Sequence, residues 1–106
     1  MTAGEARTLA LALPEAVEQD HHGRPSYRVG GKIFATQWDG EHLNVMLDEG
    51  GILTAVQSDP ETFEEVWWGK RRAAVRVDLR RVDEDILRRL LAEAWETKAP
   101  RRLLPG

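Results

Sequence analysis

Residues 20–34, DHHGRPSYRVGGKIF, hold the side chains of this chain best suited to metal or phosphate chemistry. Histidine and aspartate are common metal ligands, and a Gly-Lys pair can belong to a phosphate-binding loop. On a strand, however, His21 and His22 leave opposite faces and cannot bind one ion together, while Asp20 and His22 provide only two ligands. The third histidine, His42, follows the next turn. We therefore predict a solvated strand end, with no metal site and no cofactor.

The two Gly-Lys pairs also lack the spacing of a P-loop. That motif requires a glycine five residues before the Gly-Lys pair and Ser or Thr after it. Around Gly31-Lys32 these positions hold Ser26 and Ile33, and Gly69-Lys70 fails in the same way. Ser26 has no nucleophile-elbow context, and no pair of carboxylates is singled out for acid–base work. We assign no catalytic residue and expect a role other than catalysis.

Length and composition predict one domain over residues 1–106, because 106 residues with 42% hydrophobic content can bury one modest core. The chain has no cysteine, which excludes disulfides and thiolate chemistry. No apolar run approaches the ~18–20 residues of a membrane span, and the N-terminus lacks a basic region before its apolar part. We therefore expect a cytoplasmic protein that does not enter a membrane.

The net charge of −3 is unevenly divided between the two parts of the chain. Residues 1–66 carry 4 basic and 12 acidic side chains, whereas residues 67–106 carry 11 basic and 6 acidic ones. Such a division can mark a surface for an anionic partner, or it can mean that the two parts attract each other in the fold. The sequence leaves both interpretations open.

The first half of the chain predicts a helix followed by a hairpin sheet. Thr2 and Glu5 have the spacing of a capping box, and apolar residues at helical spacing predict a helix over about residues 3–13. Short β-rich runs follow, separated by Gly30-Gly31 and Asp39-Gly40, which suit the tight turns of an antiparallel meander.

Simple alternation of side chains along this meander predicts which residues share a face of the sheet. Phe34, Thr36 and Trp38 should lie on one face, and Ile33, Ala35 and Gln37 on the other. With helices on one face only, whichever set points outward would form an exposed surface for a partner.

The second half predicts two further helices and a strand. Residues 52–58 suit a short helix, whereas residues 63–67 fit either another turn or two of helix or a packed loop. Residues 73–79, AAVRVDL, alternate as in a strand. Asp83 is a good N-cap for the closing helix, in which residues 86–95 carry an apolar stripe.

Two stretches of this sequence together resemble the MmcQ/YjbR family. They are ALPEAVEQDHHGRPSYRVGGKIFAT, and WGKRRAAVRVDL followed by VDEDILRRLLAEAWETKAPRRL, so that the similarity covers about residues 9–104. One departure is Ala73-Ala74, where the family often places a tryptophan. The resemblance implies a CyaY/YjbR-like α+β fold, in which helices pack on one face of an antiparallel sheet of about 4–6 strands. The hairpins between two capped helices agree with that fold.

The resemblance also implies nucleic-acid binding, because members of that family are commonly labelled DNA-binding. Basic side chains neutralise phosphates, and Trp67, Trp68 and Trp38 are suited to stacking on unpaired bases. We therefore predict weak binding of nucleic acid through a basic edge. The candidate side chains are Arg28, Lys32, Lys70, Arg71, Arg72 and Arg76.

Two alternatives stay open beside nucleic-acid binding. An open sheet face with aromatic side chains would suit a protein partner or a homodimer in a non-catalytic interaction role. A metal carrier or enzyme of frataxin type is suggested by the implied fold alone, and fold does not confer function. Iron binding of frataxin type uses a ridge of acidic side chains on the first helix and the first strand. This chain lacks most of such a ridge, because its first predicted helix contains Glu5 as the only acidic residue.

Overall fold

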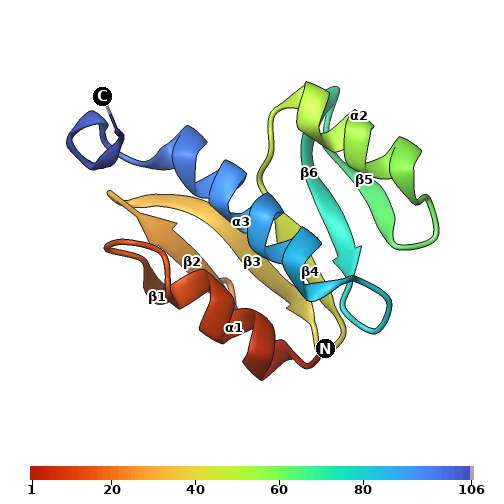
Figure 1. Cartoon of the computed structure of the whole chain (residues 1–106), viewed down its shortest axis with the longest axis horizontal. Helices are drawn as coiled ribbons and strands as arrows, with labels where there is room; N and C mark the ends of the chain where they lie inside the picture. Colours follow the sequence, from red (N-terminus) through yellow and green to blue (C-terminus); the bar gives the residue numbers. More distant parts are fainter. Residues whose placement is uncertain (106) are drawn as a thin grey trace.

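The computed structural model describes residues 1–105. It contains a six-stranded antiparallel sheet with three α-helices on one of its faces (Figure 1). The elements are α1 (Ala3–Leu11), β1 (Val17–His21), β2 (Arg24–Val29), β3 (Lys32–Asp39), β4 (His42–Val45), α2 (Glu49–Ser58), β5 (Phe63–Trp68), β6 (Arg71–Asp78), α3 (Glu84–Lys98) and the 3-10 helix η1 (Arg101–Leu103). The strand order is β1-β2-β3-β4-β6-β5. The predicted α+β class is confirmed. Among residues 1–105 no helix has the length and apolarity needed to cross a membrane.

Helices α1 and α3 begin where their predicted capping residues place them, whereas α2 begins at Glu49, three residues before the predicted start at residue 52. The Thr2 hydroxyl accepts the Glu5 amide at 3.1 Å, and the Glu5 carboxylate accepts the Thr2 amide at 2.9 Å, which completes the capping box of α1. The Asp83 carboxylate accepts the amide of Asp85 at 3.0 Å at the start of α3. Helix α1 ends at Leu11, two residues before the predicted end.

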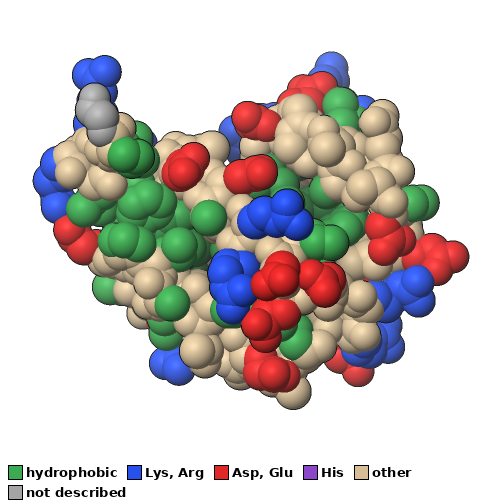
Figure 2. Space-filling model, in the orientation of Figure 1, with side chains coloured by type: hydrophobic (Ala, Val, Ile, Leu, Met, Phe, Trp, Pro, Cys, Tyr) green, Lys and Arg blue, Asp and Glu red, His purple; other side chains and the backbone are tan. Residues whose placement is uncertain are grey.

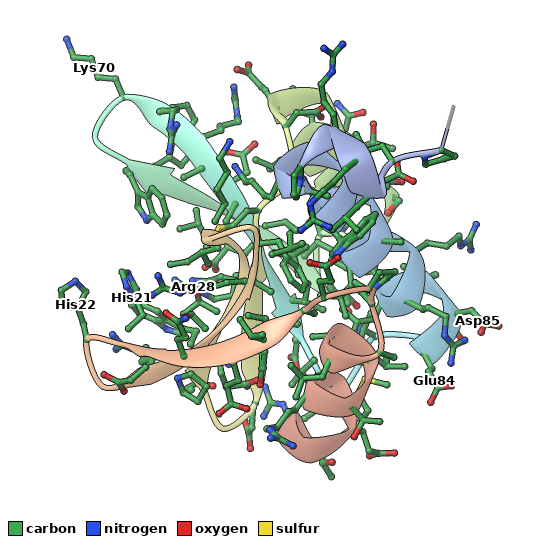
Figure 3. All side chains as sticks on the ribbon, turned by 90° about the vertical axis from the view of Figure 1, so that its left-hand side faces the viewer. His21, His22, Arg28, Lys70, Glu84 and Asp85 are labelled. Atoms are coloured by element: carbon green, nitrogen blue, oxygen red, sulfur yellow. The ribbon has the colours of Figure 1, made fainter. Side chains whose placement is uncertain are left out.

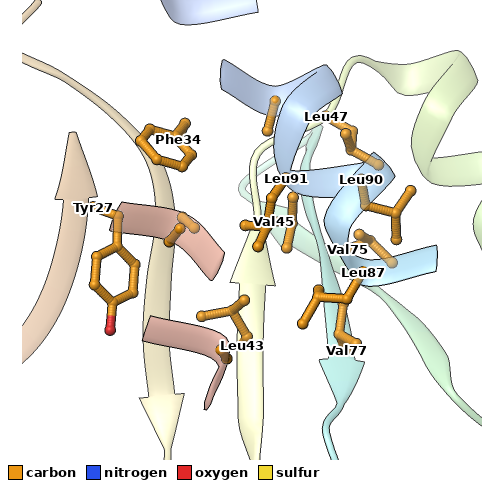
Figure 4. Close-up of a cluster of buried hydrophobic side chains, with 14 of the residues drawn as sticks. Tyr27, Phe34, Leu43, Val45, Leu47, Val75, Val77, Leu87, Leu90 and Leu91 are labelled. Atoms are coloured by element: carbon orange, nitrogen blue, oxygen red, sulfur yellow. The ribbon is translucent and has the colours of Figure 1, made fainter. Parts of the chain in front are cut away.

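One core lies between the helices and the sheet (Figure 4). Tyr27, Ala35, Val45 and Val75 are paired in a row across β2, β3, β4 and β6, and all are buried on the helix-bearing face. Helix α3 covers the centre of this row with its leucines, of which Leu91 is 1% exposed. Helix α2 packs on β5 and β6. All three α-helices lie on the same side of the sheet, and no helix of residues 1–105 covers its opposite face.

Residues 63–68 form strand β5, and the predicted helix or packed loop is wrong. The spacing of three between Phe63 and Val66 suggested a helical face. In the structure Phe63 belongs to the helix-side core, whereas Val66 packs in a small cluster on the opposite face. A strand with one buried residue on each face therefore produced the same spacing as a helix.

The strand pairing shifts register at three places, and the β-bulges at Phe34 and Ala73 change which side chains share a face of the sheet. In β3 the pairing shifts at Phe34, because Tyr27 pairs with Ala35 while Arg28 pairs with Ile33. The extra residue places Phe34 beside Ala35 in the helix-side core, and Ile33 packs against the cluster on the open face. The predicted set of Phe34, Thr36 and Trp38 on one face is therefore wrong.

The second bulge lies in β6 at Ala73. Val66 pairs with Ala74, but Trp67 pairs with Arg72, so that Ala73 is the extra residue. Arg72 consequently lies on the side of α2, where its guanidinium donates to Glu49 at 2.9 Å. Simple alternation would have placed Arg72 on the same face as Arg76.

The β1–β2 hairpin has its turn at His22 and Gly23, with φ angles of 54° and 84°. His22 is therefore a turn residue, and the expectation that it continues the strand of His21 is wrong. Their rings lie side by side, with centroids 4.5 Å apart. Within residues 1–105, no group of three or more His, Asp or Glu side chains is arranged to hold a metal ion.

The third strand connection turns at Gly40 and Glu41, one residue later than predicted. The Asp39 carboxylate accepts the Glu41 amide at 2.8 Å and lies 2.9 Å from Nδ1 of His42. These hydrogen bonds stabilise the charged carboxylate and hold the pKa of Asp39 below its ordinary value.

Gly30 in the β2–β3 turn is expected to be the least replaceable of the turn glycines. Its φ is 56°, and a Cβ at this position would lie 2.9 Å from Cδ of Pro100. We expect Gly30→Ala to lower the free energy of unfolding by about 1–3 kcal/mol, measured by urea denaturation.

Two glycines provide controls for this prediction. Gly31 has a φ of 80° with no neighbour near its Cβ position, so Gly31→Ala isolates the backbone cost. Gly40 has neither feature, and Gly40→Ala should change stability by less than about 0.5 kcal/mol. Equal losses for Gly30→Ala and Gly31→Ala would contradict the tight approach of Pro100.

Candidate nucleic-acid interface

The helix-free face of the sheet is hollowed between two hairpins. The β1–β2 and β5–β6 hairpins extend on either side of it, and Figure 3 shows His21, His22 and Arg28 on this side, with Lys70 at the tip of the β5–β6 hairpin. Ile33 and Met46 line the floor. The hollow has a volume of about 650 Å³, within the range of ~300–1,000 Å³ common for ligand sites. We call this hollow the open-face groove.

The open-face groove collects basic side chains that have no acidic partner in the part of the chain that the structure describes. Seven of the fifteen Lys and Arg side chains form ion pairs within residues 1–105, and the remaining eight do not. Five of these eight line the groove, and no Asp or Glu of residues 1–105 is among its lining residues. The five are Arg24, Arg28, Lys32, Arg71 and Lys98. The groove therefore presents a concentrated positive charge to solvent.

Trp38 holds two of the surrounding guanidinium groups in place. Arg24 and Arg76 each lie 4.1 Å from the centre of its indole ring. Arg24 also donates through Nε to the Trp38 carbonyl oxygen at 2.9 Å, and Arg76 donates to Oδ1 of Asn44 at 3.0 Å. Cation–π contact and hydrogen bonds together fix the two arginines beside Trp38, and of the two only Arg24 lines the groove.

The neighbouring Trp67 and Trp68 lie on opposite faces of the β5–β6 hairpin. Trp68 lines the open-face groove, with the Arg71 guanidinium 5.7 Å from its ring centre. Trp67 contacts Arg72, whose guanidinium lies 4.6 Å from the indole ring centre and donates a hydrogen bond to Glu49 of α2. Nε1 of Trp67 donates to Glu65 at 3.0 Å. Only Trp68 of this pair therefore faces the groove.

The structure divides the basic residues predicted from the sequence into two groups. Arg28, Lys32 and Arg71 line the groove, and Lys70 projects from the hairpin tip beside it. Arg72 and Arg76, in contrast, are held in ion pairs. The pairs are Arg72 with Glu49 and Glu65, and Arg76 with Glu64.

Sequence reasoning missed Arg24 and Lys98. Arg24 directly follows the β1–β2 turn, and a His-Gly turn signal before it could have placed it at a strand start. Lys98 is the last residue of α3, and its approach to the groove depends on how that helix crosses the sheet. No local sequence signal identifies such a contact.

The helix-bearing face has a different charge pattern, because acidic and basic side chains are intermixed there (Figure 2).

Many of the charges that make the two parts of the chain unequal form ion pairs between those parts. Five arginines of residues 67–106 bond to glutamates of residues 1–66. One such pair, between Arg102 and Glu15, lowers the pKa of Glu15 and raises that of Arg102. For these five arginines, attraction between the two parts of the chain in the fold is therefore the interpretation that applies.

The fold and the groove together define a small α+β protein with a cationic, tryptophan-lined sheet face. The family model described as YjbR matches residues 11–97, and the chain belongs to the YjbR family. The sequence resemblance to the MmcQ/YjbR family is thereby confirmed. The other two comparisons found no match among curated proteins or solved structures.

Proposed function

We propose that this protein binds nucleic acid through the open-face groove and acts as a binding module. The observation that carries the proposal is the gathering of five Lys and Arg side chains on one concave surface, with no ion pair and no acidic side chain in its lining among residues 1–105. Phosphates bind such cations and release condensed counterions from the nucleic acid, which makes the interaction favourable at low salt.

The groove argues against homodimerisation through this face. A two-fold symmetric dimer places the same patch of each copy against itself, so that five cations of one subunit would face five of the other. A protein partner would therefore need an acidic surface. The positive charge of the groove favours a polyanion more directly than it favours a protein partner.

The proposal predicts a steep dependence of oligonucleotide binding on salt. If three to five of the groove cations each contact a phosphate of a single strand, the logarithm of the association constant should fall with slope of about −2 to −3.5 against the logarithm of salt concentration. Fluorescence anisotropy of a labelled oligonucleotide measures this slope. Absence of any complex at low salt would contradict the proposal.

A further inference from the structure

We infer that the open-face groove takes single-stranded nucleic acid, with an unpaired base stacked on the indole ring of Trp68. This inference rests on the function proposed above and specifies its ligand. It follows from the positions of the aromatic rings relative to the unpaired cations.

Trp68 is the groove aromatic with a ring face open to a ligand. Trp68 is 53% exposed. The Arg71 guanidinium lies 5.7 Å from the centre of the Trp68 ring, close to the ~6 Å limit of cation–π contact. Trp38 differs, because Arg24 and Arg76 both lie within 4.1 Å of its ring centre and are held there by hydrogen bonds. A base would have to displace a guanidinium to stack on Trp38, but not to stack on Trp68.

The cations lie where the backbone of such a strand would run. Arg71 is paired with Trp68 across the β5–β6 turn, and Arg28 and Lys32 stand on the other wall of the groove. A base on Trp68 therefore leaves its own phosphates beside Arg71 and the following ones near the far wall. An aromatic platform beside a cationic track is the common arrangement for binding unpaired strands.

A duplex would not use this arrangement. Its bases are stacked inside the helix, so an exposed indole face would contact only sugar and phosphate. In a complex with a duplex, the large apolar ring of Trp68 would therefore have no base to stack on. With a single strand, the same ring removes a base face from water and adds binding energy.

The test compares a labelled oligothymidine of about ten nucleotides with a duplex at equal phosphate concentration and low salt, by fluorescence anisotropy. We expect the wild type to bind the single strand more tightly than the duplex. Trp68→Ala should weaken single-strand binding about tenfold or more and leave duplex binding unchanged. Trp67→Ala is the matched control, since this neighbouring tryptophan is 47% exposed but lies outside the groove lining, and it should retain wild-type affinity.

A second variant separates stacking from folding. Trp68→Phe keeps an aromatic face and should retain most of the single-strand affinity, and thermal unfolding of all three variants confirms that they fold. Preference for the duplex, or unchanged single-strand binding by Trp68→Ala, would overturn the inference while the proposed function stands. Failure to bind either nucleic acid, or equally tight binding of an oligoglutamate peptide to the same groove, would overturn both.

Discussion

Arg28→Glu combined with Arg71→Glu is expected to abolish measurable oligonucleotide binding, with a dissociation constant raised roughly 100-fold or more at low salt. The two arginines stand on opposite walls of the open-face groove and have no acidic partner in the described part of the chain. Reversal of one charge about 4 Å from a phosphate changes their interaction in water from about −1 to about +1 kcal/mol. Two reversals therefore remove ~4 kcal/mol before salt screening reduces the effect.

The matched control reverses two arginines that also lack acidic partners within residues 1–105 but lie outside the groove. Arg89 lines the cleft between α2 and α3, and Arg101 begins η1. Arg89→Glu with Arg101→Glu changes the net charge by the same amount and should alter the affinity only about threefold, by long-range electrostatics. Equal losses in the two double variants would show that overall charge, not the groove, governs binding.

Local signals in the sequence were sufficient to predict most elements of this fold. Thr2 and Glu5 set the start of α1, and Asp83 sets the start of α3, because a capping side chain and the amides it accepts lie within three residues of each other. The Gly30-Gly31 turn was equally local. These interactions form whatever the rest of the chain does, so the residue pattern alone identifies them.

The candidate site was only partly predictable, because the bulges at Phe34 and Ala73 depend on pairing between strands. Nothing near Phe34 or Ala73 in the sequence shows that an extra residue is accommodated there. Yet the bulge at Ala73 decides that Arg71 faces the groove while Arg72 faces α2. Trp67 and Trp68, in contrast, lie on opposite faces by the ordinary alternation of side chains along β5. Strand register, set by packing on both faces, thus determines which cations are available to a ligand.

Which arginines form ion pairs could likewise not be predicted from the sequence. Arg76 lies on the groove side of β6, but Glu64 on the neighbouring strand and Trp38 on the floor hold it. Arg28 makes a hydrogen bond with Ser26 at 3.1 Å and no ion pair within residues 1–105. The sequence presents the two arginines as equivalent, and only the assembled sheet distinguishes a structural cation from one that can contact a phosphate.

Leu91→Ala is expected to give the largest loss of stability of any substitution considered, about 2–5 kcal/mol in the free energy of unfolding. Leu91 is 1% exposed and packs beneath α3 against the central strands, so truncation removes buried contacts and leaves a cavity (Figure 4). For a domain of ~100 residues this corresponds to a decrease of roughly 10–25 °C in Tm. Urea and thermal denaturation measure both quantities.

Ile86→Ala is the control on the same helix, since Ile86 is 39% exposed and should cost less than about 1 kcal/mol. The apolar stripe predicted from the sequence includes both residues, so the difference between them measures how much of that stripe the sheet covers. Leu91 lies on the face of the sheet opposite to the groove, and the folded Leu91→Ala protein should therefore bind oligonucleotide within about twofold of the wild type. A large loss of affinity at a temperature where the variant is folded would mean that α3 sets the shape of the groove through the sheet, and that the two faces do not act independently.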